Sequence, residues 1–180
     1  DLYILGSSTE SAYLAAKLGL PYAFAGHFAP TQFYEAVGIY QRNFSPSSYL
    51  SKPYTMACAN VIAAFSDDEA HYLSLSMYQS FLNIVSDARQ PLVAPESTAL
   101  HLASEEQKHV LKNMTALSFI GSRSTLHQSL TEFVEKSGID ELIISSNIYD
   151  QKSKRKSYQN DSFLTCNRKQ FPNHRANDGN

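Results

Sequence analysis

Three serine hydroxyls and a glycine stand close together near the start of the chain, at Gly6, Ser7, Ser8 and Ser11. They follow a short apolar run and precede a helical pattern, so we predict that they lie where a strand ends and a helix begins. Backbone N–H groups and the dipole at a helix start favour an anion, and no acidic residue lies between Gly6 and Glu10. The segment is therefore a candidate phosphate cradle. Ser8 as an ordinary helix N-cap is the interpretation that spacing alone favours.

A second candidate group surrounds His27, which follows the second predicted strand. In barrels and open α/β sheets, the carboxyl ends of the strands carry the ligand sites. Tyr22, Phe24 and Phe28 are close to His27 in the sequence and could wall a flat apolar ligand such as a flavin ring. A loop histidine bonded to the backbone, beside aromatic residues of the core, is the simpler alternative.

Other chemistry finds little support in the residue types. The sequence has no CxxC and no HExxH pattern, so neither a structural zinc site nor a metalloprotease is indicated. The glycine pattern of a dinucleotide fingerprint and the lysine of a P-loop are also missing around Gly6. The remaining histidines have no partner at a useful spacing. We predict no metal, and no residue is assigned as a general acid or base.

The elements that would position these groups alternate along the chain. Short apolar runs predict strands at residues 2–5, 22–25, 54–63 and 141–145. Helical patterns lie between them, opened by the capping boxes Ser66–Glu69 and Ser104–Gln107 and by Ser122 as an N-cap. This alternation predicts βαβ units and an α/β fold with a parallel sheet. Four units suit half a barrel or a small open sheet, since a closed eight-fold barrel typically takes about 250 residues.

Composition and charge set further limits. The 180 residues carry a net charge of −2, which argues against nucleic-acid binding as the main function. No apolar run approaches the roughly 20 residues of a membrane-spanning helix, and two cysteines suit a reducing cytosol, so we expect a cytoplasmic protein. Residues 1–150 hold 8 Lys and Arg against 15 Asp and Glu, whereas residues 151–180 hold 7 against 2. The last residues are thus a different kind of sequence.

Several segments together resemble the luciferase-like flavin monooxygenases. They are YILGSS at residues 3–8, AAKLGLPYAFA at 15–25, SFIGS at 118–122, DELII at 140–144 and IYD at 148–150. Their order and spacing are similar to that family over residues 2–158, and the nearest likeness is to its uncharacterised bacterial oxidoreductases. The resemblance rests on several segments in register.

The resemblance implies the C-terminal half of a TIM barrel, with the fifth to eighth strands present. It implies reduced FMN as cofactor, with the phosphate held at Gly6, Ser7, Ser8 and Ser11, and it places Tyr22, Phe24 and His27 near the ring or the substrate. The implied activity is oxidation of an organic substrate by O2. Reduced flavin would come from NAD(P)H directly or through a flavin reductase, and family members commonly form homo-oligomers.

Alternatives remain open. The first four strands of the family are absent and a strand begins almost at Asp1, so we expect a fragment whose start lies upstream. The chain could be an incomplete, inactive gene product that needs a complementing half. A relative that transfers hydride with the deazaflavin F420, and a small open-sheet phosphate-binding module, are further alternatives. We assign residues 1–158 to a partial barrel domain and residues 159–180 to a divergent, disordered tail.

Overall fold

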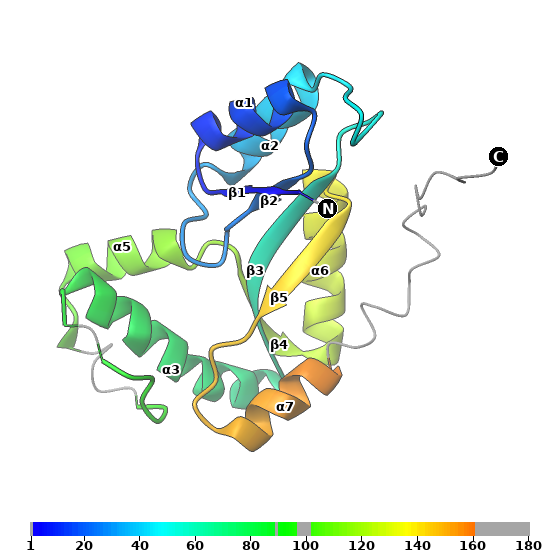
Figure 1. Cartoon of the computed structure of the whole chain (residues 1–180). Coiled ribbons are helices and arrows are strands. Elements are labelled where there is room, and N and C mark those ends of the chain that lie inside the picture. The colour runs from blue at the N-terminus through cyan, green and yellow to red at the C-terminus, as the bar shows by residue number, and fades with distance from the viewer. Residues whose placement is uncertain (1, 89, 97–101, 161–180) are drawn as a thin grey trace.

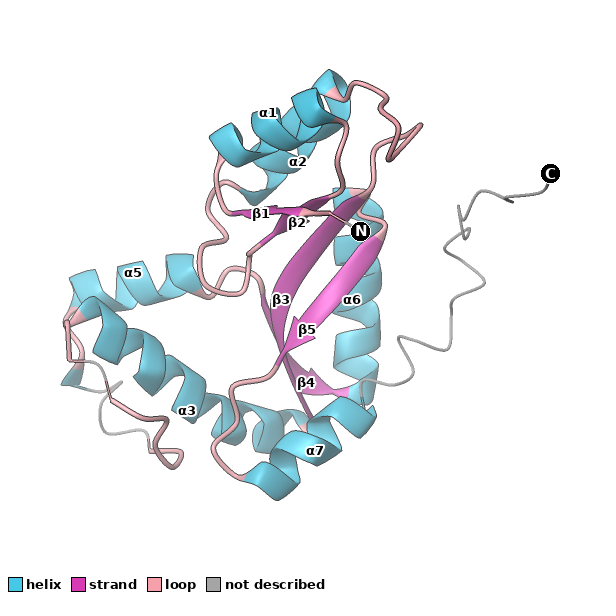
Figure 2. Cartoon of the chain, viewed as in Figure 1, coloured by secondary structure: helices cyan, strands magenta, loops and turns pink. Residues whose placement is uncertain are grey.

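A parallel sheet forms the centre of the molecule (Figure 2). The structure is a computed structural model that describes residues 2–88, 90–96 and 102–160, and all statements below concern these residues. The strands are β1 (Ile4–Gly6), β2 (Tyr22–Phe24), β3 (Thr55–Ala64), β4 (Ser118–Ser122) and β5 (Glu141–Ser145). Every strand pair is parallel. The predicted α/β fold with a parallel sheet is confirmed.

Helices follow the strands and flank the sheet (Figure 1). They are α1 (Thr9–Leu18), α2 (Phe33–Asn43), α3 (Asp67–Val85), α5 (Glu105–Met114), α6 (Arg123–Ser137) and α7 (Gln151–Asn160). Helices α1 and α6 end at Gly19 and Gly138, whose φ angles of 61° and 63° lie in the left-handed region. Glycine adopts this conformation without the steric cost of a β-carbon.

Strand β3 is the longest strand and organises the sheet. Its first residues pair with β2, and residues Asn60 to Ala64 pair with β4. Residues Met56 to Asn60 pair with β5 as well, so β5 occupies one edge of β3 while β2 and β4 share the other. The four predicted strands are all present, and β4 is an additional fifth strand that the sequence analysis did not assign.

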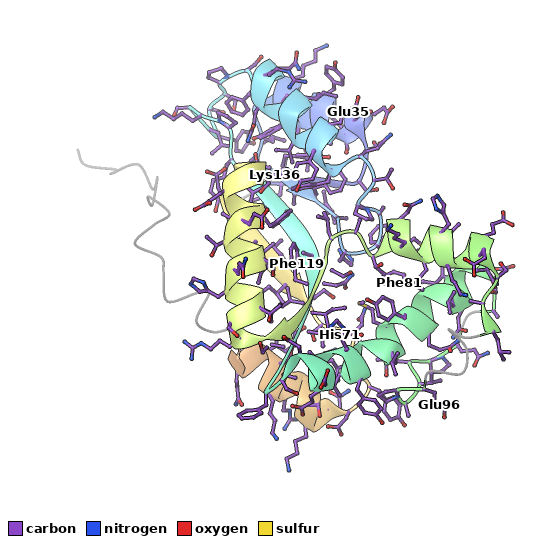
Figure 3. The ribbon with its side chains drawn as sticks, turned by 180° about the vertical axis from the view of Figure 1, so that it is seen from behind. Glu35, His71, Phe81, Glu96, Phe119 and Lys136 are labelled. Atoms are coloured by element: carbon purple, nitrogen blue, oxygen red, sulfur yellow. The ribbon has the colours of Figure 1, made fainter. Side chains whose placement is uncertain are left out.

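The two faces of β3 pack against different helices because its side chains alternate in direction. Ala57, Ala59 and Val61 belong to cores that include buried residues of α2 and α6. On the opposite face, Ile62 and Ala64 pack with residues of α3 and α5. Figure 3 shows the same division from behind, with Phe119 of β4 beside α6 and Phe81 on α3.

Part of one sheet face has no helix over it. Leu5 pairs with Ala23, which pairs with Met56, and these side chains share the face of Ile143. Leu5 is 71% exposed and Ile143 is 39% exposed. Parallel sheets are usually covered on both faces, so this is an unusual amount of apolar sheet surface in contact with solvent. Strands β1 and β5 are also edges, each with a single partner among the described strands.

The helix starts largely follow the predicted capping. Ser104 and Gln107 form a complete capping box, in which each side chain accepts from the backbone N–H of the other residue. At α3, Ser66 accepts from the Glu69 N–H, but the Glu69 carboxylate accepts from the Phe65 N–H instead.

The predicted domain boundary at residue 158 falls inside α7, and residues 161–180 of the predicted tail lie outside the described residues.

Candidate functional site

The turn between β1 and α1 holds the predicted phosphate cradle. Ser8 is the N-cap of α1, and its hydroxyl accepts from the Ser11 N–H at 3.4 Å. The Ser11 hydroxyl accepts from the Ser8 N–H at 3.4 Å and donates to the Ser8 carbonyl at 2.7 Å. The N-cap interpretation of Ser8 is therefore confirmed, and the two serines close the turn on each other. Ser7 lies beside them, half-buried.

Gly6 makes this arrangement sterically possible. A β-carbon at position 6 would lie 2.2 Å from the Ser11 hydroxyl oxygen and 2.4 Å from its β-carbon. Tyr22 supports the turn from β2, because its hydroxyl lies 3.0 Å from that of Ser11 and also donates to the Ser8 carbonyl at 3.2 Å. Burial raises the pKa of Tyr22, which keeps this hydroxyl protonated. Glycine, serines and tyrosine thus form one hydrogen-bonded unit at the carboxyl end of β1.

Tyr22 and Phe24, which the sequence places near a flavin ring, are core residues in this structure. Both side chains are fully buried. The Tyr22 ring packs on Tyr40 of α2 at a centroid distance of 5.4 Å, and Phe24 packs on Phe33 of α2 at 5.3 Å. They face the helix layer, which was the simpler alternative for these aromatics. Of the two, only Tyr22 touches the candidate site, through its hydroxyl.

His27 lies in the turn that follows β2. Gly26 lets this turn run close to β3, since a β-carbon there would lie 2.8 Å from the Cys58 carbonyl oxygen and 2.6 Å from Leu117. The imidazole contacts Phe28 edge to face at 4.9 Å, and its Nδ1 is buried without a hydrogen-bond partner among the described residues. Burial lowers the pKa of His27, so the ring is neutral at pH 7. The prediction that His27 borders a ring or a substrate stays a prediction.

Asn60 of β3 is the residue that the sequence analysis missed. Its side-chain amide donates to the His27 carbonyl at 2.5 Å and to the Ser118 hydroxyl at 3.3 Å. Asn60 is only 1% exposed, and its Oδ1 has no partner within the described chain. A polar amide inside an otherwise apolar strand is costly to bury, and this was a feature the sequence could have revealed.

The turn at Gly6 and the polar group at Asn60 lie two strands apart. Gly6 pairs with Phe24, and Phe24 pairs with Ala57. Neighbouring strands are separated by about 4.8 Å, so two spacings give a lateral distance of about 10 Å. Ser8 and Asn60 both lie beyond these paired residues in the carboxyl direction of their strands. The two polar groups therefore flank one end of the sheet at a distance that one elongated ligand can span.

A third polar cluster joins α3 to the start of α6. The Asp67 carboxylate accepts from the Ser122 N–H at 2.6 Å and from the Thr125 hydroxyl at 3.1 Å. These hydrogen bonds lower the pKa of Asp67. Ser122 is the N-cap by backbone conformation, as predicted, but its hydroxyl makes no capping bond, so α6 is capped by a carboxylate from another helix.

A cavity of about 480 Å³ lies at the carboxyl end of β3, between α3, α6 and α7. Phe65, Glu69, Arg123 and Lys156 are among the residues that line it. This cavity is separate from the predicted phosphate cradle.

Over the described ranges, no cluster of three or more His, Cys, Asp or Glu side chains could hold a metal ion. In the same part of the chain, no helix has the length and apolar character needed to span a membrane.

Sequence comparison finds relatives over most of the chain. YddN, an uncharacterised protein of Bacillus subtilis, is 42% identical over 158 residues, which are 88% of this chain and 47% of the relative. A luciferase-like monooxygenase of Escherichia coli K12 is 34% identical over the same shares of the two chains. No model of a protein family matches the sequence.

Solved structures share the fold. The crystal structure of apo-MsnO8 superposes with a TM-score of 0.79 at 26% identity, over 91% of this chain and 50% of that chain. The 3,6-diketocamphane monooxygenase of Pseudomonas putida, in complex with FMN, gives 0.58 at 15% identity, over 90% and 47% of the two chains. The coenzyme F420-dependent tetrahydromethanopterin reductase of Methanopyrus kandleri gives 0.55 at 13%, over 88% and 48%. At the two lower identities the likeness shows the fold alone.

The class of protein follows from these matches together with the sheet. The parallel strands with flanking helices correspond to about half of a TIM-barrel enzyme. The chain is similar to luciferase-like monooxygenases in sequence and in fold. It spans about half the length of the curated relatives that it matches.

Proposed function

We propose that the chain supplies the phosphate-binding part of an FMN-dependent monooxygenase, which oxidises an organic substrate with O2. One observation carries this proposal: the turn built by Gly6, Ser8 and Ser11 presents a helix N-terminus and small hydroxyls at the carboxyl end of a parallel strand. Such ends are where α/β proteins bind phosphate groups. The P. putida monooxygenase with the same fold is described in complex with FMN.

The residues present fit a phosphate group. The bonds that close the turn are long, at 3.4 Å in both directions between Ser8 and Ser11, and charge-assisted hydrogen bonds to a phosphate are shorter and stronger. A phosphate oxygen can therefore replace the Ser8 hydroxyl at the Ser11 N–H, which frees that hydroxyl to donate to the ligand. The Tyr22 hydroxyl keeps its hydrogen bond to the Ser8 carbonyl during this exchange. The flavin, when bound, supplies the redox chemistry and the protein supplies position and a dry environment.

The test is a titration of the 180-residue chain with FMN, followed by flavin fluorescence. We expect saturable binding, and Ser8→Ala to weaken it about 10- to 150-fold, since a hydrogen bond to a charged group contributes about 1.5–3 kcal/mol. Ser104→Ala is the matched control, because Ser104 caps α5 with the same reciprocal geometry away from the turn. Equal FMN affinity of Ser8→Ala and Ser104→Ala would contradict the assignment of the phosphate to this turn.

A second candidate is favoured by the uncovered sheet face. Leu5 and Ile143 expose apolar surface there, and β1 and β5 offer unpaired edges. In this alternative the chain is inactive alone and works with a complementary half that covers this face. Full FMN affinity in the absence of any other protein would contradict it.

The deazaflavin alternative rests on the fold of the M. kandleri reductase, and preference of the chain for F420 over FMN in the same titration would support it.

A further inference from the structure

The His27 turn and Asn60 combine buried polar atoms that the fold itself does not satisfy. Within the described chain, Asn60 Oδ1 and His27 Nδ1 are both buried and both lack a hydrogen-bond partner. Buried polar atoms are nearly always paired in folded proteins, and an unpaired one costs free energy that an apolar residue would avoid. Thr55 Oγ1 and Ser76 Oγ are unpaired in the same way. Asn60 and His27 differ from them because a hydrogen bond joins the two residues, so that two unpaired groups belong to one turn.

The amide orientation of Asn60 is fixed by its contacts. Its nitrogen faces two acceptors, the His27 carbonyl and the Ser118 hydroxyl. The oxygen is consequently the atom without a partner, and it can only accept a hydrogen bond. A neutral His27 imidazole likewise offers an acceptor nitrogen. Both groups suit a ligand that brings N–H or O–H donors and no charge.

The His27 turn reaches the surface of the molecule. Phe28, the outermost side chain of the turn, is 48% exposed, and His27 is half-buried. The Asn60 side-chain amide connects the turn to β3 by donating to the His27 carbonyl. Because Asn60 Oδ1 and His27 Nδ1 are buried, a ligand contacts them only when this turn moves.

We propose that Asn60 Oδ1 and the His27 imidazole form a polar subsite that accepts hydrogen bonds from the uncharged ring part of a flavin. This inference rests on the proposed function and adds the recognition of the ring to that of the phosphate. A flavin ring carries an imide N–H, and its reduced form carries further N–H groups. The lateral distance of about 10 Å between the turn at Gly6 and Asn60, two strand spacings, matches the reach of a five-carbon ribityl chain with its phosphate.

The experiment compares riboflavin with FMN, because riboflavin has the ring and the ribityl chain but no phosphate. Each is titrated into the 180-residue chain and its variants, and binding is followed by flavin fluorescence. Asn60→Leu removes the acceptor at similar volume, together with the two bonds that the amide nitrogen donates. We expect it to weaken both flavins about tenfold. His27→Leu keeps the backbone carbonyl that Asn60 holds, so it tests the same subsite should Asn60→Leu fail to fold.

Thr55→Val is the matched control. The Thr55 hydroxyl is also buried without a partner among the described residues, and Thr55 is the first residue of the same strand. We expect this variant to bind both flavins as the unmodified chain does. Ser8→Ala separates the two proposals further, because it should weaken FMN and leave riboflavin unchanged.

Each outcome decides the matter. Weaker binding of both flavins by Asn60→Leu or by a folded His27→Leu, with Thr55→Val unchanged, supports the subsite. Unaltered riboflavin binding by these two variants overturns the subsite and leaves the phosphate cradle standing. Binding of FMN without riboflavin by the unmodified chain has the same meaning. Binding of neither flavin overturns the subsite and the proposed function together.

Discussion

In the β1–α1 turn the hydroxyls of Ser8, Ser11 and Tyr22 bond to one another and to the backbone. At the His27 turn, by contrast, buried atoms of His27 and Asn60 have no partner among the described residues. The first region stabilises its own geometry, and a ligand must exchange existing hydrogen bonds to enter. The second holds its geometry at a cost, and a ligand would add hydrogen bonds that the fold lacks.

This difference separates what substitutions should do in the two regions. Substitutions in the β1–α1 turn should lower stability and FMN affinity together, because the same hydroxyls serve both. Substitution of His27 should change ligand affinity more than stability, because removing its unpaired polar atom also removes the desolvation cost of that atom. The predictions below test the first statement and compare the turn with the contact of the Asp67 carboxylate with α6.

Gly6→Ala is the substitution with the largest expected effect. The new β-carbon would collide with both side-chain atoms of Ser11, so we expect the free energy of unfolding to fall by about 1–3 kcal/mol, as in other overpacked sites. Urea unfolding measures this. Gly38→Ala is the control, because its β-carbon would meet only the flexible end of Arg42 within α2. We expect that variant to gain about 0.5–1 kcal/mol. Equal losses in both variants would refute a special role of Gly6.

Tyr22→Phe tests the hydroxyl that connects β2 to the turn. The substitution keeps the buried ring and removes the bonds to Ser11 and to the Ser8 carbonyl, so we expect a loss of about 1 kcal/mol. Thermal unfolding followed by circular dichroism measures it. Tyr13→Phe, on the exposed side of α1, is the control and should change nothing. Unchanged stability of Tyr22→Phe would show that the turn does not depend on β2.

Asp67 gives a smaller, pH-dependent effect. Its folded-state pKa is lowered by hydrogen bonds from the Ser122 N–H and the Thr125 hydroxyl. The ionised form therefore stabilises the fold above the unfolded-state pKa, and this contribution is lost as pH falls through the folded-state pKa. We expect Asp67→Asn to lower the melting temperature at pH 7 and to match the unmodified chain in strong acid. Asp68→Asn is the control, because it keeps both bonds from Asp67 to α6. A melting temperature of Asp68→Asn that is lowered at pH 7 and unchanged in strong acid, as expected for Asp67→Asn, would contradict this account.

The sequence predicted the elements better than their contacts. The four strand runs and the Ser104 capping box are local features, and each is present in the structure. Strand β4 was not assigned because a short segment bounded by serines and containing Gly121 has weak strand character. Its place beside β3, on the edge that β2 leaves open, depends on the three-dimensional arrangement.

The candidate site was predicted only in part for the same reason. Ser8 as an N-cap follows from spacing, whereas the contact of Ser11 with Gly6 and Tyr22 joins separate elements. Tyr22 and Phe24 could not be assigned to the helix face from sequence, because all residues of a buried strand are apolar. Asn60 was visible as a polar residue in such a strand, but its partners across 33 and 58 residues of chain were not.

The central claim is that the two polar regions bind different parts of one flavin. Nitrogen-15 NMR of the labelled chain, titrated with FMN and then with riboflavin, tests it most directly. We predict that FMN shifts both the backbone amides at Ser8 and Ser11 and the side-chain amide of Asn60, while riboflavin shifts the Asn60 signal alone. Shifts at the serines with either flavin but none at Asn60, or no shifts in either region, would contradict the claim.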